Sequence, residues 1–303
     1  MVTRVAIIGA GGMGAWFARL LKSRGYRIIV SDRNPNRARR LASQLRAKYA
    51  STNIEAALGS NIIILAAPAN TTVKVINEIL PATSKGALIC EICATKSVVM
   101  PALRAAQKRG IRTASIHPMF GPLARGTHGR RIIVIRTERD TRSNKILKHM
   151  LGGADVFYTR QDIHDKHTAV TVGLSHFLNI VFAMTVCKGR NLAEIRKFAG
   201  RTYDLQMLLA ETIAHEPETT ADIQIMNKEF RPVLREFEKN VRTLAKIVNS
   251  QDRARLLAQY KRVSRVLAAD PEFKAAPVAF GKVTDAQSAG SGSRHRVRSR
   301  RSS

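Results

Sequence analysis

A glycine-rich turn near the start of the sequence constrains the fold more than any other feature of this chain. The β-type run Val5–Ile8 leads into a G-x-G-x-x-G pattern, and a helix-like segment follows at once. In this context the first glycine permits a tight turn, the second lets a pyrophosphate approach the backbone, and the third lets the helix pack on the strand. The N–H groups at the helix start then face the phosphates. We therefore predict a dinucleotide site, with the turn residues Gly9, Ala10, Gly11, Gly12, Met13 and Gly14.

Asp32 supports this interpretation over a glycine turn that binds no ligand. It ends the second β-type run, where a carboxylate accepts hydrogen bonds from the ribose hydroxyls of NAD. A carboxylate also repels the 2′-phosphate of NADP, so the sequence favours NAD. Arg33, Arg37 and Arg39 could neutralise that phosphate, and NADP therefore stays open. We also assign Arg33, and Ala67 at the end of a later β-type run, to the cofactor site.

Short β-branched runs alternate with amphipathic segments in the first half of the chain. Several runs are almost entirely apolar, which is typical of strands buried on both faces of a parallel sheet. The expected strands are Val5–Gly9, Arg27–Asp32, Asn61–Ala67, Ala87–Ile92, Thr113–His117, Arg131–Arg136 and Asp155–Tyr158. The expected helices are Met13–Ser23, Pro35–Tyr49, Thr72–Leu80, Ser97–Lys108 and Thr141–Met150. The alternation predicts an α/β fold over residues 1–159, with a Rossmann-type, doubly wound, mostly parallel sheet.

The β pattern stops after Thr159, and long helical stretches follow. These stretches are Asp162–Lys188, Leu192–Ile213, Thr219–Lys228, Pro232–Ser250 and Asp252–Ala268. We therefore predict an all-α second domain over residues 160–270, which could close over a substrate, form a dimer, or do both. Residues 271–303 are basic and become rich in Ser, Gly and Arg, a composition typical of a disordered tail.

Composition and charge narrow the class of protein. The formal net charge of +29 would attract anionic metabolites and, without sequence preference, nucleic acid. A generally basic proteome or a hot, low-salt habitat gives the same charge, so specific nucleic-acid binding is not expected. No run approaches the roughly 20 consecutive apolar residues that span a bilayer. The first strand leaves no room for a secretory signal, and the 3 cysteines are too few for a disulfide framework. We expect a cytoplasmic protein without a membrane segment.

His117 is the candidate catalytic residue. It ends an expected strand at the carboxyl edge of the sheet, where ligands bind in this architecture. An imidazole titrates near pH ~6.5, which suits the removal of a proton from a hydroxyl group that becomes a carbonyl. The alternative is a structural histidine that hydrogen-bonds a carbonyl at a turn. The location of His117 and the following Pro118 and Pro122 favour the catalytic role.

Three segments resemble the prephenate dehydrogenase family, over about residues 4 to 235. The first is His117-Pro118-Met119-Phe120-Gly121-Pro122, which is similar to the family's catalytic segment. The second is a helix with a His-Asp pair near its start, His164-Asp165, and a His-Phe pair further on, His176-Phe177. The third is Glu91 to Lys96, where the family has an acid, a serine and a lysine.

The resemblance implies oxidative decarboxylation of prephenate to 4-hydroxyphenylpyruvate, or of the related arogenate, on the route to tyrosine. A hydride leaves ring carbon C4 for the nicotinamide, CO2 departs, and the ring becomes aromatic. His117 would hydrogen-bond the C4 hydroxyl and accept its proton. Loss of hydride builds positive charge at that carbon, and a basic nitrogen on the hydroxyl relieves it. We also expect a homodimer that forms through the helical domain.

One face of the helix that starts near Asp162 is expected to carry its polar residues. At about 100° per residue, a stripe about 80° wide holds Asp165, Thr168, Val172, His176 and Asn179. Polar groups on an otherwise apolar helix indicate a wet cleft, so His176 is a candidate substrate contact, with a hydrogen-bonded packing role as the alternative. His164 and His167 point away from this face and are expected to be structural. No third ligand has the spacing of a metal site, so none is expected.

Two positions depart from the family's pattern. The family's serine, which contacts the substrate hydroxyl, falls on Ala94. The family's arginine, which binds a substrate carboxylate, falls on Asp204. Loss of such a buried charge pair could weaken binding by about 2–5 kcal/mol. The candidate replacements in substrate binding are Thr95 or Cys93 for the hydroxyl, and Arg201 or Arg125 for the cation.

Two other interpretations stay open. Ala94 and Asp204 also fit a dehydrogenase or reductase of another small acid on the same scaffold. The net charge and the arginine-rich tail also fit a nucleotide-sensing or nucleic-acid-binding protein that kept the fold and lost turnover.

Overall fold

The computed structural model describes residues 3–136 and 141–285, and the chain divides into two compact units. The first unit comprises Met1–Ser175 and Glu216–Phe230, and the second comprises His176–His215 and Arg231–Ser303. The sequence places a boundary ahead of residue 160, whereas the units divide inside a long helix, and one later helix returns to the first unit. The predicted tail from residue 286 onward lies outside the described residues.

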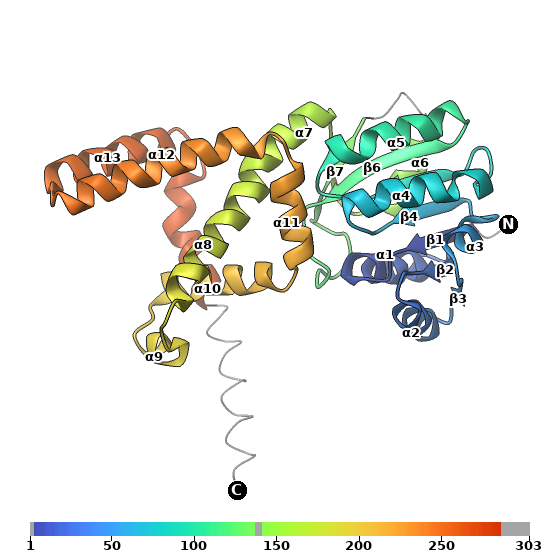
Figure 1. Ribbon diagram of the computed structural model, residues 1–303, viewed down its shortest axis with the longest axis horizontal. Coiled ribbons are helices and arrows are strands. Elements are labelled where there is room, and N and C mark those ends of the chain that lie inside the picture. The colour runs from blue at the N-terminus through green and yellow to red at the C-terminus, as the bar shows by residue number, and fades with distance from the viewer. Residues whose placement is uncertain (1–2, 137–140, 286–303) are drawn as a thin grey trace, which may run out of the picture. The chain divides into compact units, whose positions relative to one another are not determined.

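A single eight-stranded sheet forms the centre of the first unit. Its strands are β1 (Arg4–Ile8), β2 (Arg27–Ser31), β3 (Lys48–Tyr49), β4 (Ile62–Leu65), β5 (Leu88–Glu91), β6 (Arg112–Pro118), β7 (Arg131–Ile135) and β8 (Asp155–Thr159). They lie in the order β3-β2-β1-β4-β5-β6-β7-β8, and all neighbours are parallel except β6 and β7 (Figure 1). The order reverses between β1 and β4, where doubly wound sheets bind nucleotides. The predicted Rossmann-type, mostly parallel sheet followed by helices is confirmed.

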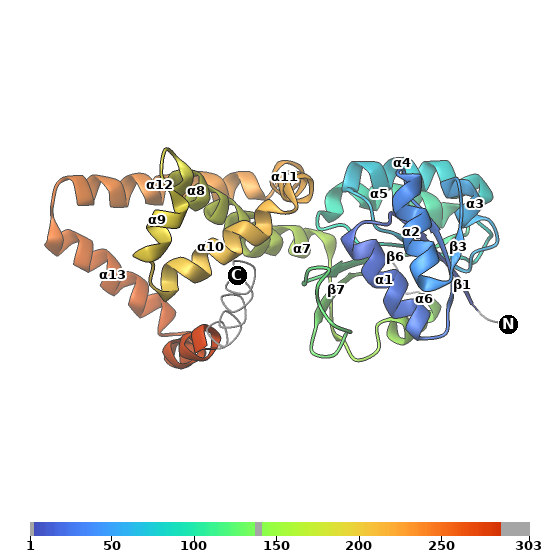
Figure 2. The ribbon, with the colours of Figure 1, turned by 90° about the horizontal axis from the view of Figure 1, so that it is seen from below.

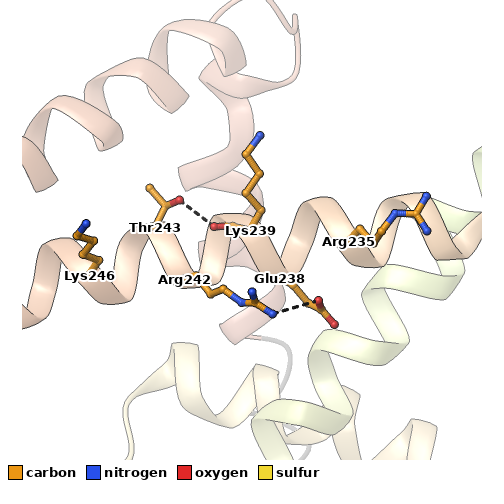
Figure 3. A pocket seen from close by; sticks show the side chains of 6 residues that line it. All are labelled: Arg235, Glu238, Lys239, Arg242, Thr243 and Lys246. Atoms are coloured by element: carbon orange, nitrogen blue, oxygen red, sulfur yellow. Dashed lines mark hydrogen bonds and ion pairs between the residues drawn. The ribbon is translucent and has the colours of Figure 1, made fainter.

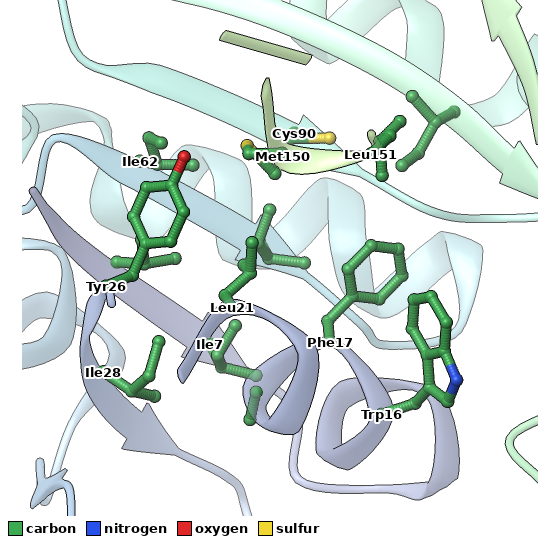
Figure 4. Close-up of a cluster of buried hydrophobic side chains, with 14 of the residues drawn as sticks. Ile7, Trp16, Phe17, Leu21, Tyr26, Ile28, Ile62, Cys90, Met150 and Leu151 are labelled. Carbon is green, nitrogen blue, oxygen red and sulfur yellow. The ribbon is translucent and has the colours of Figure 1, made fainter. Parts of the chain in front are cut away.

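Helices cover both faces of this sheet because its central strands are apolar on both sides. They are α1 (Gly12–Ser23), α2 (Pro35–Leu45), α3 (Asn53–Ala57), α4 (Ala69–Ile79), α5 (Lys96–Lys108) and α6 (Thr141–Met150). All four residues of β4 are buried, and they alternate between two apolar cores. One core includes Phe17, Leu21 and Met150 from α1 and α6 (Figure 4). The other includes side chains of α3, α4 and α5.

The segment between β2 and β4 differs from the prediction of a single helix over Pro35–Tyr49. α2 ends at Leu45 because Arg46 adopts a left-handed conformation with φ of 46°. The chain then forms the short edge strand β3, in which Lys48 pairs with Ile29 of β2. No glycine or proline marks the end of α2, so the sequence lacks the usual stop signal.

The long helix after β8 contains a change of helical geometry. α7 (Gln161–Thr168) is followed by the π-helical segment Ala169–Leu174 and then by α8 (Ser175–Cys187). The wider turns of the π segment change the angle per residue, so a projection at a uniform α-helical angle does not carry through it. By length and composition alone, the helical run Gln161–Cys187 could cross a membrane. Helices of soluble proteins pass the same test, so this is weak evidence for a membrane segment.

The second unit is helical, and many apolar side chains among its described residues are exposed to solvent in the single chain. It contains most of α8, together with α9 (Leu192–Lys197), α10 (Arg201–Ala214), α12 (Phe230–Asn249) and α13 (Arg253–Leu267) (Figure 2). Helix α11 (Pro217–Met226) belongs to the first unit. Met184, Leu209 and Val263 are each more than half exposed. Apolar exposure on this scale is typical of an interaction surface.

Residues 276–285 are helical and follow a short helical turn, Phe273–Ala275. The composition assigned this stretch to a disordered tail, so the tail prediction is wrong for it. Most of its residues are apolar or small, and the serine and arginine enrichment that suggested disorder begins further on.

Candidate functional site

The glycine turn between β1 and α1 has the geometry that a dinucleotide fingerprint requires. Gly9 has φ of +103°, and a Cβ there would lie 2.3 Å from the Ala66 carbonyl oxygen. A Cβ on Gly14 would lie 1.7 Å from the Gly9 carbonyl oxygen, so helix and strand can meet this closely only at a glycine. A Cβ on Gly11 would meet nothing within 4 Å. The open side of Gly11 therefore leaves room for a phosphate.

The start of α1 offers hydrogen-bond donors at the same place. The helix begins at Gly12, and its N-cap residue, Gly11, provides no side chain to satisfy the first N–H groups. No acidic residue belongs to the first turn of α1, and the carboxylate of Glu216 lies nearby, with its Oε1 3.8 Å from the position of a Cβ on Gly12. Unpaired N–H groups, the positive end of the helix dipole and open space thus coincide, and these residues fit a pyrophosphate.

Two alanine substitutions in this turn should separate folding from cofactor binding. Gly14→Ala should lower the thermal unfolding midpoint, because the added methyl group overlaps the Gly9 carbonyl oxygen. Gly11→Ala should leave the midpoint near that of the wild type but weaken NAD binding about tenfold or more, because the methyl group occupies the phosphate's approach. Scanning and titration calorimetry measure the two effects. Unchanged NAD affinity in Gly11→Ala would contradict this placement of the cofactor.

Asp32, at the end of β2, forms a hydrogen bond with the glycine turn. One carboxylate oxygen accepts a hydrogen bond from the Ala10 N–H at 2.6 Å, and the other accepts one from the Asn34 N–H at 2.7 Å. The Ala10 contact places the carboxylate directly beside the turn. A ribose that lies next to a pyrophosphate on this turn would therefore come within reach of Asp32.

The arginines near Asp32 differ in their surroundings. Arg39 lies over the ring of Tyr49, with its guanidinium carbon 5.0 Å from the ring centroid. Arg33 is exposed, and its guanidinium lies 3.8 Å from the carboxylate of Glu218 in α11. This weak surface pair does not fix the Arg33 side chain, which could turn toward a 2′-phosphate.

The segment that follows His117 packs against the glycine turn. Pro122 is so close to Gly12 that a Cβ on the glycine would lie 2.9 Å from the proline side chain. The Phe120 ring packs against Trp16 of α1 at a tilt of 57°, with a distance of 4.9 Å between ring centroids. His117 lies near the end of β6, opposite Ile133 of β7, and is 7% exposed. The fold thus brings the glycine turn and the His117 segment together at the carboxyl edge of β1 and β6.

A chain of hydrogen bonds leads from His117 into the protein. His117 Nδ1 lies 2.9 Å from His164 Nε2, and His164 Nδ1 lies 2.9 Å from a carboxylate oxygen of Asp165. All three residues are buried. The sequence predicted a structural role for His164, and the structure places its ring in direct contact with His117, the candidate base. The contact joins two segments far apart in the sequence, so helical spacing alone could not reveal it.

Asp165 also forms the N-terminal cap of α5. Its two carboxylate oxygens accept hydrogen bonds from the backbone N–H groups of Lys96 at 3.1 Å and Ser97 at 2.8 Å. Burial alone would raise the pKa of Asp165, but the hydrogen bonds from His164 and from these N–H groups hold the pKa below its ordinary value. Asp165 is therefore ionised and accepts every one of these bonds.

Glu91 and Lys96 form an ion pair whose side chains are 0% exposed, with 2.9 Å between Lys96 Nζ and a Glu91 carboxylate oxygen. Lys96 Nζ also donates to the carbonyl oxygen of Ile116, the residue before His117, at 2.7 Å. The second Glu91 oxygen accepts from the Cys93 N–H at 2.6 Å, and the Ser115 hydroxyl also donates to Glu91. This buried network holds the end of β6 in place and thereby fixes the backbone that carries His117.

Cys93 and Ala67 lie close together at the ends of β5 and β4. The Ala67 carbonyl oxygen accepts a hydrogen bond from the Thr72 hydroxyl at 3.0 Å and lies 3.5 Å from the Cys93 sulfur. Burial raises the pKa of the Cys93 thiol, so the thiol stays protonated. The pair Cys90 and Cys93 therefore does not form a redox site, because a redox cysteine must be able to form a thiolate.

The four predicted substrate residues lie in different settings. Thr95 is the N-cap residue of α5 and is 3% exposed. Arg125 is exposed in the loop after β6. Arg201 is exposed at the first position of α10, and His176 lies near the start of α8. Thr95 and Arg125 belong to the first unit, and the other two belong to the second. Their binding roles stay predictions.

His176 has a buried ring nitrogen, Nδ1, that finds no hydrogen-bond partner within residues 3–136 and 141–285. Burial lowers the pKa of this histidine, so its ring is neutral. A buried polar atom without a protein partner is a position that a ligand can satisfy. The predicted stripe from Asp165 to His176 does not hold as one α-helical face, because the π segment lies between them.

One open hollow of the second unit lies along α12 and holds none of the predicted site residues. Figure 3 shows its six side chains, Arg235, Glu238, Lys239, Arg242, Thr243 and Lys246. The Arg242 guanidinium lies 3.7 Å from Glu238, so part of its positive charge is paired. This hollow is a charged, solvated helix face.

Two family models match this chain. Residues 17–134 match the nucleotide-binding domain of prephenate dehydrogenase, and residues 160–262 match the prephenate dehydrogenase dimerization domain. The chain belongs to the prephenate dehydrogenase family. The resemblance inferred from the sequence motifs is therefore confirmed.

Two curated relatives agree with this assignment. A probable arogenate/prephenate dehydrogenase of Methanocaldococcus jannaschii is 30% identical over 82% of this chain and 57% of its own length. A probable prephenate dehydrogenase [NADP(+)] of Schizosaccharomyces pombe is 24% identical over 82% of this chain and 58% of its own length. This member of the prephenate dehydrogenase family thus spans less than two thirds of these two curated relatives.

The fold of the family is also seen in a crystal structure of the Aquifex aeolicus prephenate dehydrogenase in complex with hydroxyphenyl propionate and NAD+. It matches with a TM-score of 0.72 at 19% identity, over 89% of this chain and 99% of that chain. At this level of identity the match shows that the two chains share a fold.

Proposed function

We propose that this chain is an NAD(P)-dependent dehydrogenase that oxidatively decarboxylates prephenate or arogenate. The observation that supports this most strongly is the buried chain His117–His164–Asp165, located in the same unit as a glycine turn that fits a pyrophosphate. Membership of the prephenate dehydrogenase family and the names of its relatives support the substrate class.

The proposed cofactor site consists of the glycine turn, the start of α1 and the end of β2. The residues assigned to it are Gly9, Ala10, Gly11, Gly12, Met13, Gly14, Asp32, Arg33 and Ala67. When bound, the nicotinamide supplies the acceptor for the hydride. Asp32 favours NAD, because its carboxylate would repel a 2′-phosphate, while Arg33 could pair with that phosphate if NADP binds instead.

His117 is the proposed proton acceptor. As the C4 hydrogen leaves with its electron pair, the O–H bond electrons of the C4 hydroxyl relieve the positive charge at that carbon, and the hydroxyl proton passes to the His117 ring. The carboxylate on the ring then departs as CO2, its bonding electrons complete the aromatic ring, and the C4 oxygen takes the proton back from the His117 ring to give the phenol. The task of His117 is therefore to hold one proton at one ring nitrogen.

The residues proposed to bind the substrate carboxylates differ from the pattern of the family. Asp204 stands where the family has an arginine, and we propose Arg201 or Arg125 as the cation, His176 as a further contact and Thr95 as the hydroxyl donor. Prephenate and arogenate differ in the side chain at this end of the molecule, where arogenate carries an ammonium group. Parallel kinetics with both compounds therefore test the consequence of Asp204 directly.

We propose that the chain forms a cytoplasmic homodimer through its second unit. The second family model describes a dimerization domain, and apolar side chains such as Met184 and Val263 are exposed within the described chain. A second copy would cover these side chains and gain the free energy of apolar burial. Light scattering on the purified protein should give twice the chain mass of 33.5 kDa.

An absorbance assay tests the proposed activity. Purified protein mixed with NAD or NADP and with prephenate or arogenate should produce the near-ultraviolet absorbance of reduced nicotinamide, together with CO2. Absence of this signal for both substrates under both cofactors would refute the proposal. If the protein binds NAD but oxidises another small acid, the scaffold assignment survives and the substrate assignment fails.

A further inference from the structure

We infer that His164 and Asp165 are positioning residues that hold His117 in the tautomer whose Nε2 accepts the substrate proton. The part of this inference that concerns the substrate rests on the proposed function. The tautomer itself follows from hydrogen bonds inside the first unit, so it can be tested whether or not prephenate is the substrate.

Asp165, at the inner end of the row of hydrogen bonds from His117 through His164, determines which atom donates in each bond. Asp165 is surrounded by donors, because it accepts bonds from two backbone N–H groups at the start of α5. These contacts keep the carboxylate ionised, so it carries no proton to donate. The nitrogen of His164 that faces Asp165, Nδ1, must therefore carry a hydrogen and donate it.

The protonation of His164 in turn determines which nitrogen donates in its hydrogen bond with His117. Burial lowers the pKa of His164 further than its bond to Asp165 raises it, so the ring is neutral and carries one hydrogen. Since that hydrogen is on Nδ1, Nε2 of His164 has a lone pair. The 2.9 Å contact between His164 Nε2 and His117 Nδ1 then requires that His117 donates from Nδ1.

Two consequences for His117 follow from this order. A neutral His117 ring that carries its hydrogen on Nδ1 has its lone pair on Nε2, so Nε2 is the basic atom. When Nε2 accepts a proton, the ring becomes cationic, and the chain to the Asp165 carboxylate stabilises the new charge. In the Ser-His-Asp triad of hydrolases, an aspartate likewise orients a histidine ring without itself becoming protonated.

Nitrogen NMR of the histidine rings tests the tautomer directly. In protein labelled with ¹⁵N-histidine, long-range proton–nitrogen spectra distinguish a protonated ring nitrogen from an unprotonated one. We expect Nδ1 protonated and Nε2 unprotonated for both His117 and His164 above pH 7. The chain has 8 histidines, and the spectra of His117→Asn and His164→Gln assign the two signals. A His117 ring that carries its hydrogen on Nε2 would overturn the inference.

Three variants test the positioning role in turnover. His164→Leu removes the acceptor for His117 Nδ1–H and should lower kcat about 100-fold with little change in KM. His164→Gln retains an acceptor oxygen and should recover part of the loss. His167→Leu, on the same helix but exposed, is the matched control and should keep wild-type kinetics. Equal kcat values in His164→Leu and the wild type would overturn the positioning role.

The two kinds of failure can be told apart. A wild-type protein that turns over neither substrate would contradict the proposed function, while the NMR spectra would still report the tautomer. An active wild type with the opposite tautomer would leave the function intact and refute the role of His164 and Asp165. Circular dichroism of His164→Leu separates a loss of turnover from a loss of folding.

Discussion

His117→Asn should lower kcat for prephenate or arogenate about 10²- to 10⁴-fold, the range expected when a general base is removed. The asparagine amide nitrogen takes nearly the position of Nδ1 and can still donate to His164, while nothing takes the place of Nε2. The change therefore removes the basic atom and retains the hydrogen-bonded chain. Steady-state kinetics with a saturating cofactor measure the loss.

The affinity for NAD serves as the control for this substitution. The glycine turn and Asp32 hold the cofactor in the proposal, and neither contacts the altered nitrogen, so the dissociation constant of NAD should stay within about twofold of the wild-type value. If His117→Asn keeps more than a tenth of the wild-type kcat, His117 is not the proton acceptor. A large loss of NAD affinity would instead indicate that the substitution disturbs the turn.

Lys96→Met should lower the free energy of unfolding by about 3–5 kcal/mol, because it leaves the Glu91 carboxylate buried without its cation. Both side chains of the pair are 0% exposed, so water cannot take the place of the lost partner. For a protein of this size, the thermal midpoint should fall by roughly 10 °C. Denaturant titration and scanning calorimetry measure the change.

A double variant distinguishes loss of a charge partner from loss of packing. In Glu91→Gln with Lys96→Met, the amide oxygen can still accept from the Cys93 N–H, and no unpaired charge remains. The double variant should therefore be more stable than Lys96→Met alone. Lys108→Met, at the exposed end of the same helix, is the matched control and should change the free energy of unfolding by less than about 0.5 kcal/mol. Equal stabilities of Lys96→Met and Lys108→Met would show that the Glu91–Lys96 ion pair does not stabilise the end of β6.

Much of the first unit could be predicted because its signals are local. Four-residue apolar runs such as Ile62–Leu65 indicate strands buried on both faces, and the glycine turn places the first strand and helix in order. The end of α2 could not be predicted, because Arg46 takes a left-handed conformation and no glycine or proline in the sequence signals it. The π segment Ala169–Leu174 was missed for a similar reason: its sequence is compatible with an ordinary helix.

In the candidate site, too, the residues with a local sequence signal could be predicted and those without one could not. His117 could be identified from a local pattern, because a strand end, two prolines and a family motif converge on it. His164 could not be assigned, because its partner lies on another element and the uniform helical projection turned it away from the polar face. The adjacent His164-Asp165 pair in the sequence was the available signal, since a carboxylate next to a buried imidazole commonly orients it.

Asp165 links the assembly of the fold to the chemistry proposed for it. The same carboxylate begins α5 and ends the histidine chain, so a variant that loses this charge loses a helix start together with the orientation of the base. Local fraying at the start of α5 would release His164, and the acceptor nitrogen of His117 would no longer be defined. Amide hydrogen exchange at Lys96 and Ser97 should therefore report on how much of the population is competent for proton transfer at any moment.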